Sequence, residues 1–125
     1  MSNKYLEDII NIENTPYGWC ENTGRDEIWK EQREKYGFDE RETWDLDFTF
    51  FCWLYSRLKM FKEIDFIDLT FHKFNINGKT MTQEECIDKM IENCEKIIKE
   101  KKLNLKKEKD EVFDIWKACS NSMWW

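Results

Sequence analysis

The segment from Asp39 to Lys62 constrains the fold most strongly, because apolar side chains occur on nearly every side of the helix that it predicts. Asp39, with Glu42 three residues later, resembles a capping box, so we expect the helix to begin there. Such a helix must be buried by neighbours on several sides. One face carries Trp44, Phe48, Phe51, Tyr55 and Leu58, and another carries Leu46, Phe50, Trp53, Leu54 and Phe61.

Four other segments have helical spacing and can supply these neighbours. A short helix is expected from Tyr5 to Ile12, before Pro16, and a second over residues 26–36, ended by Gly37. Residues 82–85, Thr-Gln-Glu-Glu, form a capping box that predicts a third helix, and a fourth is expected from about Asp110. The third presents Ile87, Met90, Ile91, Cys94, Ile97 and Ile98 on one stripe, and the fourth presents Val112, Phe113, Trp116, Cys119 and Met123.

Between the long helices lies a segment of alternating apolar residues that predicts a small β-hairpin. The alternation has one slip, and Asn77-Gly78 supplies the pair of positive φ angles that a tight turn needs. The alternating positions are Ile67, Leu69, Phe71, Phe74 and Ile76. The expected fold is therefore mainly α: a compact helical domain of about four to five helices around a buried central helix, with one small β-hairpin.

Length and composition favour one domain over residues 1–125, with enough aromatic side chains to build a core. Five scattered cysteines, an odd number with no Cys-x-x-Cys pair, indicate reduced thiols in the cytoplasm. No apolar run is long enough for a membrane span, and the N-terminus has no export signal. A net charge of −6 disfavours direct nucleic-acid binding. The basic segment from Lys99 to Lys109 alternates with acids and reads as a solvated connection between helices.

No catalytic motif is present, so we expect a protein that is not an enzyme and that needs no cofactor. His72 is the only histidine, and a Cys-His pair would require one of the scattered thiols beside it. Asp45 and Asp47, with Glu40 and Glu42 nearby, could hold Mg²⁺, but carboxylates two residues apart diverge on a helix, and acids at a helix start suit its dipole. We therefore expect no metal site.

Arg57 is the strongest candidate for a binding residue, because it lies among apolar side chains on the central helix. It could form an internal ion pair with Asp45, Asp47 or another acid. Alternatively, with Lys59 and the aromatic residues Trp44, Trp53 and Tyr55, it could present a ligand-binding pocket edge to phosphate or carboxylate. The terminal pair Trp124 and Trp125 could dock on the core or form an interface, including a homo-oligomeric one.

The order of these elements resembles small uncharacterised proteins encoded by bacteriophages and prophages of Firmicutes. The resemblance covers about the last two thirds of the chain. It implies a phage origin, in the cytoplasm of a host cell, and carries no activity or functional residues with it. It rests on Trp44-Asp45-Leu46-Asp47, Trp53-Leu54, Arg57-Leu58-Lys59 with Phe61, the hairpin, residues 82–91 and the terminal Met123-Trp124-Trp125.

Two binding functions follow as hypotheses. The first is a counter-defence protein that captures and sequesters a small nucleotide-type immune signal in an aromatic and arginine pocket, which two subunits could share. The alternative is an inhibitor that blocks a host defence protein, as anti-CRISPR proteins do, with an acidic surface that mimics nucleic acid. A role in virion structure or assembly is a further alternative.

Overall fold

The computed structural model describes residues 24–43, 45–64, 68–100 and 105–123, and these residues have the expected fold class. They form a mainly helical structure with one small antiparallel hairpin. The helix expected over residues 5–12 lies outside the described residues. The elements in chain order are α2 (Asp26–Tyr36), η2 (Glu40–Thr43), α3 (Leu46–Lys62), β1 (Lys73–Ile76), β2 (Lys79–Thr82), α4 (Gln83–Lys99), α5 (Lys106–Cys119) and η3 (Ser120–Ser122).

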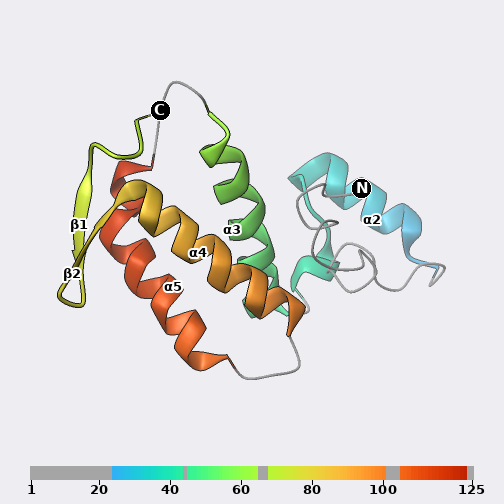
Figure 1. Cartoon of the computed structure of the whole chain (residues 1–125). Helices are drawn as coiled ribbons and strands as arrows, with labels where there is room; N and C mark the ends of the chain where they lie inside the picture. The colour runs from blue at the N-terminus through green and yellow to red at the C-terminus, as the bar shows by residue number, and fades with distance from the viewer. Residues whose placement is uncertain (1–23, 44, 65–67, 101–104, 124–125) are drawn as a thin grey trace.

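Helix α4 is the centre of the described bundle, because it packs against both α3 and α5 (Figure 1). The hairpin lies along one edge, where β1 contacts α5 and β2 contacts α4. Helix α2 lies beyond α3, away from α4 and α5 (Figure 1). None of the described helices has the length and apolar character needed to cross a bilayer.

The core forms around α4, where the sequence signals are strongest. The Thr82 side chain accepts a hydrogen bond from the Glu85 backbone N–H, and the Glu85 side chain accepts one from the Thr82 backbone N–H. These two bonds confirm the capping box. The apolar stripe of this helix then packs between α3 and α5. The most deeply buried side chains of the core are those of Phe51, Cys52, Leu54, Tyr55, Cys86, Ile87, Met90, Cys94, Val112, Ile115 and Cys119.

Helix α3 begins later than expected, and the prediction that Asp39 caps it is wrong. Asp39 is buried and binds arginine side chains, and the short helix η2 separates it from α3. The N-cap is Asp45 instead, whose Oδ1 accepts a hydrogen bond from the Phe48 N–H at 3.1 Å. Asp39 Oδ1 does accept a backbone N–H, that of Arg41 at 3.0 Å, but this contact lies at the start of η2 and not of α3.

The hairpin is shorter than the alternating pattern predicts. Asn77 and Gly78 have φ angles of 52° and 86°, as the tight turn requires. However, only residues 73–76 form β1, so Leu69 and Phe71 precede the strand, and Ile67 lies outside the described residues. Leu69 is buried and its carbonyl accepts the Glu84 N–H at 2.9 Å. Its apolar character therefore reflects packing beside the start of α4 and not strand alternation.

Helix α5 begins at Lys106, four residues before the expected start at Asp110. Part of the basic segment, Lys106 to Lys109, is therefore helical and does not belong to a connecting loop. Lys106 pairs with Asp110 across one turn at 2.6 Å, an arrangement that supports a helix start despite the basic composition.

The four described cysteines are buried, and their burial predicts low reactivity. Burial raises the pKa of the Cys94 and Cys119 thiols to about 12, and it also raises the pKa of Cys86. Only the thiolate reacts readily. We therefore expect iodoacetamide at pH 8 to leave Cys52, Cys86, Cys94 and Cys119 unmodified in the folded protein and to alkylate all four in urea, as measured by peptide mass mapping. Rapid alkylation of Cys94 without denaturant would contradict this burial.

Candidate functional site

A row of side chains, exposed except for the half-buried Phe50, runs along α3 on the side away from the core. These positions alternate in spacing by four and three residues, so they lie on one face of the helix. Leu46 and Met60 are 66% and 57% exposed, and Trp53 is 39% exposed, although α3 was expected to be covered on several sides. We call this row the α3 stripe; it consists of Leu46, Phe50, Trp53, Arg57 and Met60.

Aromatic rings extend the α3 stripe onto α5. The Phe50 ring stacks on Trp53 with centroids 6.4 Å apart, and it stacks on Phe113 of α5 at 5.5 Å. Phe113 is 42% exposed, whereas the sequence pattern placed it on the buried face of the last helix. A continuous aromatic surface of this kind, open to solvent, is typical of an interaction site.

Arg57 lies within the α3 stripe and makes no internal ion pair among the described residues, so the expected pairs with Asp45 or Asp47 do not form. Its guanidinium carbon lies 4.6 Å from the centroid of the Trp53 ring. Nη1 also donates a long hydrogen bond of 3.3 Å to the Trp53 carbonyl. The acids proposed as its partners have other roles, since Asp45 caps α3 and Asp47 binds Lys109. Arg57 therefore presents its charge to solvent on an aromatic support.

The structure does not place the remaining predicted binding residues beside Arg57. Tyr55 lies two residues from Trp53, about 200° around the helix, and is buried in the core. The ammonium group of Lys59 lies 5.9 Å from the Tyr55 ring, also away from the stripe. Trp44, Trp124 and Trp125 lie outside the described residues. The described part of the predicted site is therefore reduced to Arg57 and Trp53.

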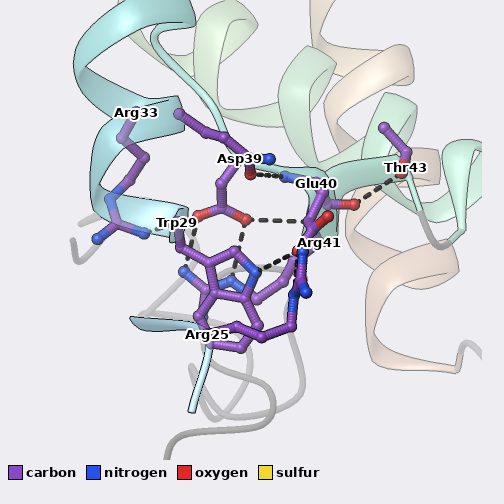
Figure 2. A network of polar contacts seen from close by, with 8 residues as sticks. Arg25, Trp29, Arg33, Asp39, Glu40, Arg41 and Thr43 are labelled. Atoms are coloured by element: carbon purple, nitrogen blue, oxygen red, sulfur yellow. Dashed lines mark hydrogen bonds and ion pairs between the residues drawn. The ribbon is translucent and has the colours of Figure 1, made fainter. Parts of the chain in front are cut away.

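A second cluster, which the sequence reasoning missed, joins α2 to η2 through buried charges (Figure 2). Asp39, 2% exposed, accepts hydrogen bonds from Nε and Nη2 of Arg41 at 3.0 and 2.8 Å and from Nη1 of Arg33 at 2.7 Å. The Arg41 guanidinium lies 4.3 Å from the centre of the buried Trp29 ring. Glu40 completes the cluster by accepting from Trp29 at 2.9 Å.

The charges of this cluster hold one another in their ionised forms. Burial alone would raise the pKa of Asp39, but the hydrogen bonds from Arg41 and Arg33 outweigh it and lower that pKa. Arg25 and Trp29 likewise lower the pKa of Glu40. The Asp39 carboxylate accepts hydrogen bonds from both arginine side chains and from the Arg41 backbone N–H, so we assign the cluster a structural role. The sequence signal for this cluster was Trp29, because a large aromatic side chain in a mostly polar helix is expected to be buried against another element.

Arg57 does not line any of three surface hollows found on the described part of the chain. The first lies along α4 between Asp88 and Glu100, the second lies beside the hairpin turn, and the third lies near Tyr36 and Phe38. His72 is exposed just before β1 and contacts the Phe71 ring edge to face. Within the described residues, no three histidine, cysteine or acidic side chains are grouped so as to hold a metal ion.

Comparison with protein-family models, with curated proteins and with solved structures finds no match for this chain.

Proposed function

We propose that this chain is a non-enzymatic binding protein that blocks a protein partner by docking the α3 stripe against it. The observation that carries the proposal is the row of mostly exposed apolar and aromatic side chains, which includes a guanidinium that binds no carboxylate of the described residues. Trp and Arg are the residues most often found as energetic anchors of protein interfaces. The stripe is also an open surface, which suits a macromolecular partner better than an enclosed small ligand.

The chemistry of the stripe defines the partner that fits it. Spacing by four and three residues matches an apolar seam on a second helix. The Arg57 guanidinium retains N–H donors that no described carboxylate accepts, so the partner should offer an Asp or Glu beside its apolar row. We therefore propose an amphipathic helix with one carboxylate in its seam as the bound element. The setting, inhibition of a host defence protein by a phage protein, rests on the sequence resemblance alone.

The acidic-mimic version of this proposal has less support from the described surface. Lysines alternate with acids along α4 and α5, where Lys89 pairs with Glu111 and Lys96 with Glu108. A face of mixed sign resembles the phosphate backbone poorly. Binding through the α3 stripe should therefore depend on salt only through the Arg57 contact.

Calorimetric titration with two synthetic helical peptides tests this proposal. Both carry leucines at seam spacing, and they differ only in a Glu or a Lys placed to meet Arg57. We expect the Glu peptide to bind and the Lys peptide to bind roughly tenfold more weakly, because a like charge is then forced against the guanidinium. An Arg57→Glu variant should reverse the preference.

Two variants control the peptide experiment. Trp53→Ala should weaken both peptides by about tenfold or more, since it removes the central ring of the stripe. Lys59→Ala, on the other side of the same helix, should leave both affinities unchanged. No binding of either peptide, or equal binding by Trp53→Ala and the unaltered protein, would contradict the proposal.

Capture of a nucleotide-type ligand is the second candidate, favoured by the guanidinium of Arg57 stacked on Trp53. An aromatic ring can hold a base by stacking, and a neighbouring arginine can bind its phosphate. Native mass spectrometry with nucleotide extracts from cells whose immune signalling has been triggered tests this function. A small mass that is retained by the protein and lost in Arg57→Ala, but not in Lys59→Ala, would favour capture over protein blocking.

A further inference from the structure

We infer that, in the free protein, a second copy of this chain covers the α3 stripe through antiparallel pairing of the two α3 helices about a twofold axis. The inference shares its surface with the proposed function but does not depend on it. It starts from the spacing of the stripe, whose five members repeat with the period of 3.5 residues found in paired helices. A helix with this repeat can pair with an identical helix, because a twofold axis makes one surface its own complement.

The distribution of charge along α3 selects the antiparallel direction. The helix starts with the carboxylates of Asp45 and Asp47, and Arg57, the cation within the α3 stripe, lies in its second half. Antiparallel pairing brings the acidic start of one helix beside Arg57 of the other. Parallel pairing would instead place two Arg57 guanidinium groups side by side within an apolar seam, which is unfavourable.

The positions of the apolar residues fix the register. With the twofold axis between Phe50 and Trp53, the Phe50 ring packs on the partner's Trp53, and the same contact forms twice. Leu46 then lies against the aliphatic stem of the partner's Arg57, whose guanidinium reaches Asp47, the neighbour of Leu46. Each copy therefore supplies the carboxylate that the stripe of the other lacks.

Asp47 has the capacity for this second contact. Its Oδ2 accepts from the Lys109 ammonium at 2.5 Å, and its side chain remains 54% exposed. A carboxylate has two oxygens with about four acceptor positions, so one lysine does not saturate it. In the proposed dimer, Asp47 is shared between Lys109 of its own chain and the partner's Arg57.

The seam is short, which sets the expected strength of the dimer. Helix α3 is 17 residues long, and therefore about 25 Å, so the paired surface lies at the small end of specific interfaces. We expect a dimer that dissociates on dilution. A partner helix that binds the stripe must displace the second copy, so its binding converts the dimer to a one-to-one complex.

Sedimentation velocity over a range of concentrations, with a charge swap, tests the inference. The unaltered protein should sediment as a dimer at high concentration. Arg57→Glu and Asp47→Lys should each raise the dissociation constant by roughly tenfold or more, because each places like charges together twice. The double variant Arg57→Glu, Asp47→Lys should recover the dimer, since both contacts regain opposite charges. Circular dichroism of each variant establishes that it is folded.

Matched controls separate this dimer from other associations. Lys59→Glu makes the same charge change on the other side of α3 and should leave the dimer intact. An equimolar mixture of the two single variants should form a heterodimer, seen as an intermediate mass in native mass spectrometry. A monomer at all concentrations, or a dimer unaffected by Arg57→Glu, would overturn the inference. Peptide binding by a protein that never dimerises would leave the proposed function intact.

Discussion

An Asp39→Ala variant is expected to lose about 3–5 kcal/mol of folding free energy, which is the usual cost of breaking a buried ion pair from one side. The change removes the carboxylate that holds both Arg41 and Arg33. Arg41, whose side chain is only 9% exposed, would then stay buried against Trp29 without that counter-charge. Urea unfolding followed by circular dichroism measures the loss, and hydrogen exchange over residues 26–36 shows whether α2 detaches first.

Asp88→Ala is the matched control for this experiment. Asp88 forms an ion pair with Lys62 in which both side chains are about half exposed, so its removal should cost about 1 kcal/mol or less. A loss for Asp39→Ala as small as that for Asp88→Ala would show that the buried cluster does not hold α2.

The pH dependence provides a second readout of the same carboxylate. Because the arginines hold the pKa of Asp39 below its ordinary value of 3.8, its contribution to stability is complete above that pH. The contribution is lost as the pH falls through the lowered pKa of the folded state. The stability difference between the unaltered protein and Asp39→Ala should therefore be constant near neutrality and shrink below about pH 4. A difference that persisted undiminished at pH 2 would assign the effect to packing.

A Phe51→Ala variant is expected to be destabilised by about 3–5 kcal/mol, the range for removing a fully buried aromatic ring. Phe51 is completely buried and packs edge to face on Phe50, with centroids 5.2 Å apart. It also contacts Phe113 at 5.6 Å, so its loss would leave a cavity between α3 and α5. Thermal or urea unfolding measures the effect.

Trp53→Ala provides the informative comparison, because Trp53 lies two residues along the same helix on its exposed side. Its removal should cost about 1 kcal/mol or less of folding free energy, while weakening every association of the α3 stripe. If Trp53→Ala lowers the folding free energy but leaves association unchanged, Trp53 belongs to the core and not to the binding surface. A loss of about 1 kcal/mol or less for Phe51→Ala would likewise contradict the placement of Phe51 in the core.

The elements with complete local signals were predicted from the sequence. Helix α2 has the expected bounds because Gly37 ends it in a left-handed conformation, with φ of 85°. The start of α4 was predicted because Thr82 and Glu85 satisfy each other's backbone groups over three residues. The tight turn at Asn77-Gly78 follows from the ability of these residues to adopt positive φ. Each signal lies within a few residues, so it needs no knowledge of tertiary contacts.

The errors occurred where distant residues decide the outcome. Asp39 has the pattern of a cap, but Arg33 and Arg41 take its carboxylate. Periodicity shows which residues share a face of a helix and not whether another element covers that face. Phe113, on the apolar face predicted for the last helix, is therefore 42% exposed. Arg57 was singled out because it is a charged residue among apolar ones, but its surroundings depend on which helices pack beside it.

The double role of Thr82 has a consequence for the order in which the chain folds. Thr82 pairs with Lys73 in the hairpin register, and its side chain also caps α4, so no linker separates the strand from the helix. Both contacts join residues close in sequence, and closing such short loops costs little chain entropy. Residues 73–99 can therefore organise as one local unit, onto which α3 and α5 condense from either side, and contacts of this short range favour rapid folding.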